Sequence, residues 1–223
     1  MKSWVRSLGF DVKRYDPTLR SPDEQRAWLL ETRRVEIVID VGANEGQWTR
    51  NLRRRGFSGR VVCFEPLSDA FEVLTEREKH RVALGSQDED GVVLHVAGNS
   101  QSSSLLAMAD RHVAAAPTSA YVATEIVPLR RLDSFDFAGR VFLKIDAQGA
   151  EHEILEGAAE TLRACVGVEL ELSFVELYEG QALASDLFEF MSAQGFQVLA
   201  AWPGYADPLS REMLQLNVIF ARL

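Results

Sequence analysis

A chain of 223 residues, of which 47% are hydrophobic and 26% charged, is long enough for one sizeable α/β domain and too apolar for a disordered protein. Its formal net charge of −9 disfavours nucleic acid as a partner, because affinity for a phosphate backbone is built largely from Lys and Arg contacts. The sequence has no apolar run of the ~18 residues that a membrane span needs and no signal-peptide pattern, so we expect a cytoplasmic enzyme that acts on small molecules.

Residues 1–34 are predicted to form a helical extension that precedes a main domain of residues 35–223. The extension contains a first short helix, a turn at Asp16-Pro17, and a second helix that begins at the cap signal Ser21-Pro22-Asp23-Glu24. An open alternative is that this extension closes over the active site.

Residues 35–46, Val-Glu-Ile-Val-Ile-Asp-Val-Gly-Ala-Asn-Glu-Gly, predict a buried parallel strand that runs into a tight loop and a helix. Open α/β sheets bind nucleotides at such a junction. Gly42 and Gly46 can adopt positive φ, Asn44 tolerates the left-handed region, and Asp40 is expected to face the ligand as a fixed anion. The pattern alone also fits a plain turn between a strand and a helix.

A dinucleotide fits this turn poorly, because the G-x-G-x-x-G pattern needs glycines where the chain has Asn44 and Gln47. S-adenosylmethionine carries an ammonium, a sulfonium and a ribose, which suit acidic and amide partners better. Residues 59–64 predict a second strand that ends in Glu65-Pro66. A carboxylate at this strand end is placed to accept hydrogen bonds from both ribose hydroxyls.

A helix over residues 69–79 and a third strand over residues 81–84 are predicted next. The end of this strand is expected to pass the adenine, so Leu84 and Gly85 are candidate base contacts, with a plain turn as the alternative. An additional strand is predicted over residues 91–97.

The polar loop 99–104 is expected to bring Ser103 and Ser104 over the ligand, although such clusters are usually plain loops. Residues 110–119 are Ala-rich and weakly patterned, which predicts a mobile connection. Residues 125–132 predict an extended segment. We expect it at a sheet edge because it contains Pro128, and proline is confined to edge strands and bulges.

Two further strands carry acids toward the same edge of the predicted sheet. Residues 141–145 are predicted to form a strand that ends in Asp146, which should lie next to the methyl donor. The period of two places Glu169 and Glu171 on one face of the following strand, where carboxylates rarely lie without a partner or a function. The other predicted elements are helices over 152–162 and 185–194, a strand over 166–172, and a closing hairpin of strands over 196–202 and 214–221.

The sequence resembles the FkbM-type methyltransferases over nearly its whole length. The resemblance rests on Val-Ile-Asp-Val-Gly-Ala-Asn-Glu-Gly-Gln (38–47), Phe-Glu-Pro (64–66), Val-Ala-Leu-Gly (82–85), Leu-Lys-Ile-Asp-Ala-Gln-Gly-Ala-Glu (143–151), Leu-Glu-Leu-Ser-Phe (170–174), Leu-Tyr-Glu-Gly-Gln (177–181) and Leu-Gln-Leu-Asn-Val-Ile-Phe (214–220). One departure is Asn217, which stands where such proteins are expected to have an aspartate. An amide cannot serve there as a base or as a strong metal ligand.

The resemblance implies a class I methyltransferase fold. This is a Rossmann-like three-layer α/β sandwich whose mostly parallel seven-stranded sheet has an antiparallel C-terminal hairpin strand. It also implies S-adenosylmethionine as methyl donor and O-methylation of a small-molecule hydroxyl, on a sugar, a glycolipid or polysaccharide glycan, or a polyketide-type natural product.

Methyl transfer to an alcohol needs oxygen, methyl and sulfur in line and a group that takes the hydroxyl proton. Asp146 is our first candidate for that base, Glu171 is the second, and His152 is a rival. The two carboxylates offer oxygen ligands that suit Mg²⁺, so a divalent metal stays an alternative.

Tyr178, Glu179 and Gln181 follow the fifth main strand and are expected to line the acceptor side, because Tyr and Gln hydrogen-bond polyhydroxylated substrates. Two other functions stay open. One is a non-catalytic adenosyl-binding module, and the other is a nicotinamide oxidoreductase, which Asn44 and Gln47 disfavour. The sequence leaves homodimerisation open.

Overall fold

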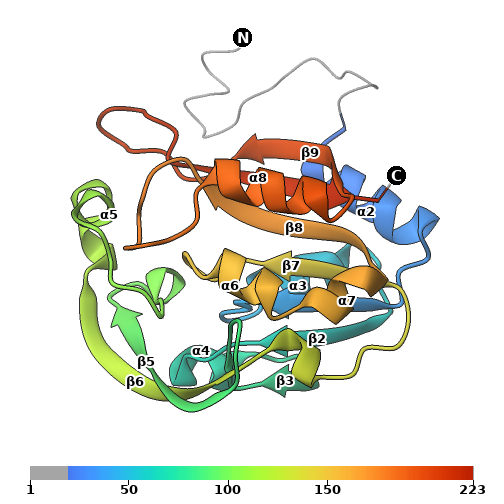
Figure 1. Ribbon diagram of the computed structural model, residues 1–223, viewed down its shortest axis with the longest axis horizontal. Coiled ribbons are helices and arrows are strands. Elements are labelled where there is room, and N and C mark those ends of the chain that lie inside the picture. The colour runs from blue at the N-terminus through green and yellow to red at the C-terminus, as the bar shows by residue number, and fades with distance from the viewer. Residues whose placement is uncertain (1–19, 223) are drawn as a thin grey trace.

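The computed structural model describes residues 20–222, which form a large and a small β-sheet with flanking helices (Figure 1). The large sheet consists of β1 (Ile37–Val41), β2 (Arg60–Phe64), β3 (Glu78–His80), β7 (Val141–Ile145), β8 (Cys165–Ser173), β9 (Gln197–Pro203) and β10 (Gln215–Ala221). The small sheet consists of β4 (Ala83–Leu84), β5 (Glu89–Ala97) and β6 (Tyr121–Arg130).

The α-helices are α2 (Pro22–Thr32), α3 (Gln47–Arg54), α4 (Ser68–Val73), α5 (Asp110–Ala115), α6 (Glu151–Glu156), α7 (Ala159–Ala164) and α8 (Ala184–Ala193). Three short 3₁₀ turns are η1 (Ser100–Ser102), η2 (Pro117–Ser119) and η3 (Leu132–Ser134).

The strands of the large sheet lie in the order β3-β2-β1-β7-β8-β10-β9. Strand β10 is antiparallel to both of its neighbours, and the other pairs are parallel. This arrangement confirms the predicted class I methyltransferase fold, with its antiparallel C-terminal hairpin strand.

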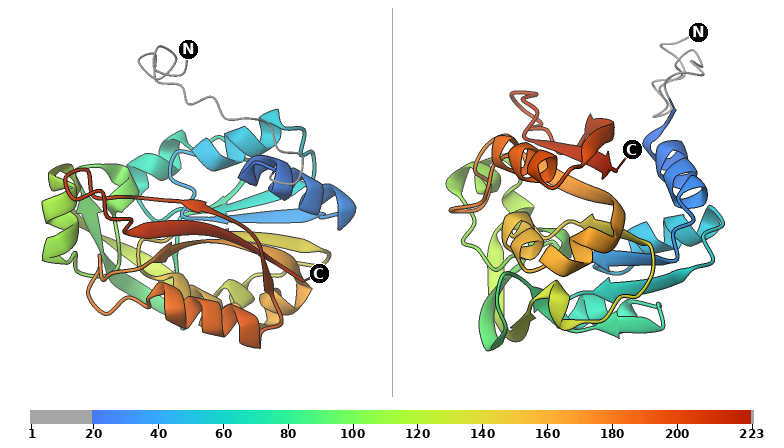
Figure 2. Two further views of the ribbon diagram at one scale, coloured as in Figure 1. Left: turned by 90° about the horizontal axis from the view of Figure 1, so that it is seen from above. Right: turned by 45° about the vertical axis from the view of Figure 1, so that its right-hand side comes forward.

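Helices cover both faces of the large sheet, and the view from above in Figure 2 shows the sheet between two helical layers. Alternate strand residues face opposite sides. Ile39 and Leu143 pack in a core cluster with α6, α7 and α8. Val38 and Phe142 pack in a second cluster with α2 and α3. The predicted three-layer sandwich is thus built from two hydrophobic cores.

Helix α2 begins at the predicted cap. Ser21 and Glu24 form a reciprocal capping box at its start. The Arg26 guanidinium in this helix pairs with Glu169 of β8 at 2.6 Å, and both side chains are buried. This buried ion pair links α2 to strand β8 of the large sheet. The predicted first short helix and the turn at Asp16-Pro17 lie outside the described residues.

The prediction of one continuous helix over 152–162 is wrong. The structure has two short helices in its place, α6 and α7, which are separated at Gly157. A Cβ atom at Gly157 would lie 2.0 Å from the Gly85 carbonyl oxygen. The backbones of the large-sheet helices and of the segment after β4 therefore approach each other at a point where only glycine fits. The helix ends where this contact is made.

The predicted helix over 69–79 is too long, since α4 ends at Val73. The Lys79 ammonium donates to the carbonyl oxygens of Phe71 and Leu74, at 2.7 and 2.9 Å, and so satisfies the end of the helix. The chain then adds β3 beside β2. The predicted third strand over 81–84 is confirmed only at Ala83–Leu84, as β4, and it pairs with β6 in the small sheet and not with β2 in the large one.

Strand β6 lies in the middle of the small sheet, between β4 and β5, so the predicted edge position is wrong. Pro128 is accommodated because the β5–β6 register shifts between Glu89↔Leu129 and Val92↔Val127. A bulge at this point removes the need for an N–H donor. Residues 110–119, predicted to be a mobile connection, form α5 and η2.

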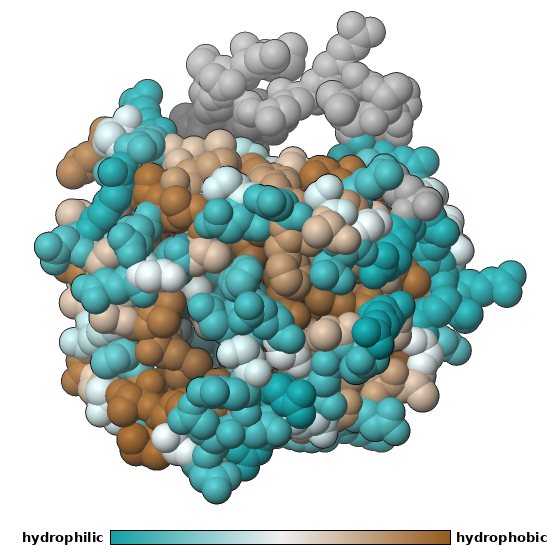
Figure 3. All heavy atoms as spheres, in the orientation of Figure 1, coloured by the Kyte–Doolittle hydropathy of each residue, from teal (hydrophilic) through white to brown (hydrophobic). Residues whose placement is uncertain are grey.

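Within residues 20–222, no helix has both the length and the apolar character needed to cross a membrane. On the face seen in Figure 3, apolar surface gathers at the lower left, over the small sheet. Val93, Val122 and Ile126 are exposed hydrophobic residues of β5 and β6.

Candidate functional site: a cavity at the strand ends

A cavity of about 460 Å³ opens at the carboxyl ends of β1, β2 and β7. The sheet order reverses direction between β1 and β7, and such switch points are where open α/β sheets bind ligands. The strand ends contribute Val41–Asn44, Phe64–Leu67 and Asp146–Gln148 to its lining. A second wall comes from residues 99–105 and from α5 and η2.

The turn after β1 adopts the left-handed conformations that its sequence predicts. Gly42 has φ +67° and Asn44 has φ +47°, and both line the cavity. A Cβ atom at Gly42 would lie 1.8 Å from the carbonyl oxygen of Asp146, so β1 and β7 meet at a backbone contact that only glycine permits. Gly46, with φ +84°, does not line the cavity, so its expected contact with the ligand is corrected. A Cβ atom at Gly46 would lie 2.7 Å from Leu74 Cδ1, so this glycine makes room for the Leu74 side chain.

Glu65 and Pro66 line the cavity at the end of β2. The Glu65 carboxylate is buried and accepts backbone hydrogen bonds from Asn44 at 2.7 Å and from Leu67 at 2.8 Å. Burial raises the pKa of Glu65 to about 7, although the two N–H donors lower it in part. The carboxylate therefore holds the turn and borders the cavity.

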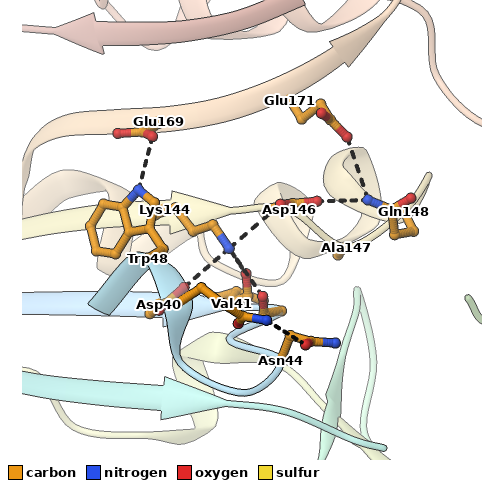
Figure 4. Close-up of polar contacts among 12 residues, drawn as sticks. Asp40, Val41, Asn44, Trp48, Lys144, Asp146, Ala147, Gln148, Glu169 and Glu171 are labelled. Carbon is orange, nitrogen blue, oxygen red and sulfur yellow. Dashed lines mark hydrogen bonds and ion pairs between the residues drawn. The ribbon is translucent and has the colours of Figure 1, made fainter. Parts of the chain in front are cut away.

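Asp40 does not face the cavity, which corrects the expectation that it contacts the ligand. Its side chain is fully buried on the α3 face of the sheet and accepts a 2.5 Å hydrogen bond from Thr49. Its other oxygen lies 3.1 Å from the Lys144 ammonium (Figure 4). Asp40 and Lys144 are register partners on adjacent strands, and a buried carboxylate is stable there only with such a partner.

Lys144 lines the cavity and is a residue that the sequence prediction missed. Its ammonium lies 3.0 Å from the Gly42 carbonyl oxygen and 3.8 Å from Asp146 Oδ2. Burial lowers its pKa, but the pairs with Asp40 and Asp146 outweigh this effect, so the pKa lies above its usual range. The signal in the sequence is a lysine inside the apolar strand Val-Phe-Leu-Lys-Ile, which requires buried partners.

Asp146 and Glu171 both line the cavity, and Gln148 joins them. The Gln148 amide donates to Asp146 Oδ1 at 2.7 Å and to Glu171 Oε2 at 3.4 Å (Figure 4). Gln215 donates to the same Glu171 oxygen at 2.8 Å. Burial, together with the charges of Asp146 and Glu151, raises the pKa of Glu171 to about 8. Glu171 is thus largely protonated at neutral pH.

Gln148 is the second residue that the sequence prediction missed. Its φ of +53° is unusual for a residue with a side chain and costs conformational energy. The buried Glu151 carboxylate holds this turn by accepting from the N–H groups of Ala147 and Gly149, at 2.9 and 3.1 Å. The loop after β7 therefore presents one amide to the carboxyl groups of Asp146 and Glu171.

Tyr178, Glu179 and Gln181 do not line the cavity, so their expected contact with the acceptor is corrected. The Gln181 side chain accepts from the backbone N–H groups of Leu177 and Tyr178, at 2.9 and 2.7 Å, and so shapes its own loop. Glu179 is exposed to solvent. Tyr178 is buried and donates its hydroxyl hydrogen to Gln148 Oε1 at 2.7 Å, which orients the amide.

The remaining candidate contacts divide between the cavity and the protein interior. Leu84, Ser103 and Ser104 line the cavity, whereas Gly85 packs against Gly157 instead. The Ser104 hydroxyl donates to the Gln148 carbonyl oxygen at 2.7 Å. His152 lies outside the lining, 3.9 Å from Glu156 on its own helix.

In the part of the chain that the structure describes, no group of three or more His, Cys, Asp or Glu side chains is arranged to hold a metal ion.

S-adenosylmethionine fits the groups present in this cavity. Gly42 and Asn44 bring the backbone close to the ligand space, and Glu65 presents a carboxylate to the hydroxyls of a ribose. Val82, Leu84 and Ile154 supply an apolar lining for a flat base. Asp146 offers an anionic oxygen beside the turn. These residues would hold the donor.

The chain is similar to known methyltransferases. Residues 40–198 match the methyltransferase FkbM domain family. The 2-O-methyltransferase NoeI of Sinorhizobium fredii (strain NBRC 101917 / NGR234) is 24% identical over 189 residues, which cover 75% of this chain and 74% of that protein.

Two solved structures are similar at low sequence identity. Methyltransferase FkbM from Methylobacillus flagellatus KT is 15% identical, with a TM-score of 0.48, over 82% of this chain and 43% of that chain, so this chain spans less than half of that protein. Magnesium protoporphyrin IX methyltransferase from Synechocystis PCC 6803, solved with bound S-adenosylmethionine, is 10% identical, with a TM-score of 0.46, over 99% of this chain and 89% of that chain.

The family match runs from Asp40 in β1 into β9. It includes Glu65, Asp146, Glu171 and the turn of residues 42–46 after β1, which we call the donor turn. Because it covers most of the chain, this protein belongs to the FkbM family of S-adenosylmethionine-dependent methyltransferases.

Proposed function

We propose that this methyltransferase acts on a hydroxyl group of a carbohydrate and that Asp146 takes the hydroxyl proton. The observation that carries the proposal is that the donor turn after β1 and the Asp146 carboxylate open on the same cavity. S-adenosylmethionine, when bound, supplies a methyl group activated by its sulfonium. The chain itself must place the acceptor oxygen, exclude water and receive one proton.

Asp146 suits the role of proton acceptor because it is held and remains accessible. One oxygen accepts from Gln148, the other lies 3.8 Å from the Lys144 ammonium, and the side chain is 40% exposed. An orienting partner and a free acceptor position are what a general base needs. Glu171 is a weaker candidate, because a carboxyl with a pKa of about 8 is mostly protonated at neutral pH. In its protonated state the Glu171 carboxyl group can donate a hydrogen bond to the substrate that receives the methyl group.

The charges around the cavity favour an uncharged acceptor. The ionisable side chains among the described lining residues are Glu65, His112, Lys144, Asp146, Glu171 and Tyr205. The single lysine is already paired with Asp40 and with backbone carbonyl oxygens. A phosphorylated or carboxylated acceptor would need free cationic side chains at the site. A neutral polyol would instead use the amide and hydroxyl groups of the wall formed by residues 99–105, which supports a sugar.

Transfer to oxygen also has the support of the similarity to NoeI, which is a 2-O-methyltransferase. The experiment is to incubate the purified protein with S-adenosylmethionine and a panel of methyl glycosides of common hexoses and deoxyhexoses. Mass spectrometry should detect a sugar methyl ether. The variant Asp146→Asn should lose turnover and keep its affinity for the donor in calorimetry. Asp136→Asn, at a position outside the cavity lining, is the matched control and should keep both.

Each alternative has its own result in these assays. A non-catalytic adenosyl-binding module would bind the donor and methylate nothing. A nicotinamide oxidoreductase would bind NAD in calorimetry and not S-adenosylmethionine. Methylation of polyketide hydroxyls in place of glycosides would contradict the acceptor class and keep the transfer to oxygen. Full turnover by Asp146→Asn would contradict its role as the base.

A further inference from the structure

One wall of the cavity carries polar groups that neither the donor turn nor the proton transfer uses. Asn99, His112 and Ser119 line the cavity from the segment between β5 and β6, and we call these three residues the insertion wall. His112 is 6% exposed and Ser119 is 1% exposed. These side chains come from the small sheet and its connections, while Glu65 and Asp146 come from the large sheet.

Two atoms of the insertion wall are buried without a hydrogen-bond partner among residues 20–222. They are Nδ1 of His112 and Oδ1 of Asn99. The Asn99 amide nitrogen donates to the Ser119 hydroxyl at 3.0 Å, and its carbonyl oxygen is the atom left without a partner. Buried polar atoms in native structures are nearly always paired, so these two atoms, in residues that line the cavity, need a partner such as a ligand hydroxyl or an ordered water.

Aromatic contacts fix the position of the His112 ring. The ring of Tyr178 stands nearly perpendicular to it, with centroids 5.1 Å apart. The Tyr178 hydroxyl in turn donates to Gln148, whose amide holds Asp146. Tyr205, from the loop between β9 and β10, also lines the cavity, and its ring centroid lies 6.4 Å from that of His112. His112 is thus separated from the Asp146 carboxylate network by one packed tyrosine.

Burial also keeps the His112 ring neutral at neutral pH. It lowers the pKa of His112 below the usual value of 6.5, an effect that the nearby Leu177 carbonyl opposes in part. A neutral imidazole has one nitrogen that accepts a hydrogen bond, whereas a charged imidazolium has none. The ring can therefore receive a hydroxyl hydrogen.

We propose that the insertion wall is the acceptor subsite, in which His112 and Asn99 accept hydrogen bonds from hydroxyl groups of a sugar ring and Tyr205 covers its C–H face. A ring that is apolar on its faces and hydroxylated at its edge matches an aromatic surface next to two acceptor atoms. This inference rests on the proposed function and adds the residues that bind the acceptor. The subsite binds only, and the proton of the reacting hydroxyl still goes to Asp146.

The test compares His112→Phe and His112→Gln with the wild type on a methyl glycoside that the wild type methylates. The phenylalanine keeps the shape of a ring and removes both nitrogens, and the glutamine keeps a hydrogen-bonding amide. His112→Phe should raise the KM for the glycoside at least about tenfold while kcat changes much less, because a binding contact is lost and not the base. His112→Gln should recover part of the loss.

Donor affinity, measured by calorimetry with S-adenosylhomocysteine, should be unchanged in both variants. The matched control is His152→Gln, whose histidine lies outside the cavity lining and should leave KM and kcat unchanged. Thermal unfolding of each variant checks that the fold is intact.

A second readout does not depend on turnover. In the full chain labelled with ¹⁵N-histidine, His112→Gln identifies the His112 signal. The methyl glycoside, added to the complex with S-adenosylhomocysteine, should shift this signal and leave that of His152 in place. An unshifted His112 signal, or an unchanged KM in His112→Phe, overturns the inference while the proposed function stands. If the wild type methylates no glycoside of the panel, the proposed function fails and this inference falls with it.

Discussion

The ammonium of Lys144 lies 3.1 Å from a carboxylate oxygen of Asp40 in the buried centre of the sheet, where it joins β7 to β1. The same ammonium donates to the carbonyl oxygens of Val41 and Gly42, at 3.2 and 3.0 Å. The pair therefore stabilises the start of the donor turn, and of its two members only Lys144 lines the cavity. Asp40 supports the fold of the turn, and the acids among the described residues that line the cavity are Glu65, Asp146 and Glu171.

Replacing Lys144 by methionine should lower the free energy of unfolding by about 3–5 kcal/mol, because Asp40 would stay buried without its cation. The double variant Lys144→Met/Asp40→Asn should recover part of that loss, since it removes the unpaired charge as well. Urea unfolding of the wild type, both single variants and the double variant gives the coupling. A double variant no more stable than Lys144→Met would contradict the pairing.

Gly42→Ala should weaken donor binding at least about tenfold and destabilise the fold, because a Cβ atom would lie 1.8 Å from the Asp146 carbonyl oxygen. Gly180→Ala is a matched control, since Gly180 has a similar φ of +76° and a Cβ atom added there would meet nothing within 4 Å. That variant should lose only the ~1–2 kcal/mol of a left-handed alanine and keep its donor affinity. Equal donor affinity in both variants would show that the β1–β7 contact does not shape the site.

Glu65→Gln should weaken the binding of S-adenosylmethionine about tenfold, because one of the two backbone N–H groups that donate to the carboxylate would face an NH₂ group. Glu45→Gln changes an exposed neighbour on the same turn and should leave the affinity unchanged. Calorimetry of the two variants tests this, and an unaltered affinity in Glu65→Gln would remove Glu65 from the donor site.

Glu171→Gln should stabilise the protein at pH 8. The folded-state pKa of Glu171, about 8, lies above its ordinary value of 4.5, so between these values the folded state binds more protons than the unfolded chain. The contribution of Glu171 to stability is therefore present at low pH and is lost as the pH rises toward 8. Removing the ionisable group should raise the free energy of unfolding at pH 8 by roughly 2–4 kcal/mol.

The measurement is urea unfolding at pH 5 and pH 8, with Glu179→Gln as the exposed control. The gain in stability should be larger at pH 8 than at pH 5. A gain of the same size at both values of pH would mean that ionisation of Glu171 is not the cause.

The sequence was sufficient to predict the strand ends but not the direction of every side chain. A strand ending in an acid followed by a turn correctly brought Glu65 and Asp146 to one cavity, because the carboxyl ends of parallel strands meet at one edge. Asp40 lies inside its strand, and the period of two does not say which face of a sheet a helix will cover. Its carboxylate is covered by α3.

The remaining differences come from contacts between segments distant in the sequence. Strand β4 pairs with β6, which lies far along the chain, and no local pattern specifies this partner. The long helix predicted over 152–162 divides at Gly157 because the Gly85 backbone lies against it. His112 was not predicted as a site residue because its segment has no clear periodicity, and only the packing of α5 brings the ring to the cavity.

The most direct test of the central claim is mass spectrometry of a methyl glycoside panel incubated with the wild-type protein and S-adenosylmethionine. The account predicts a glycoside that gains one methyl group as a methyl ether, together with one equivalent of S-adenosylhomocysteine, and no product from Asp146→Asn at full donor occupancy. Donor binding without methylation of any sugar hydroxyl, or methylation at an atom other than oxygen, would contradict it.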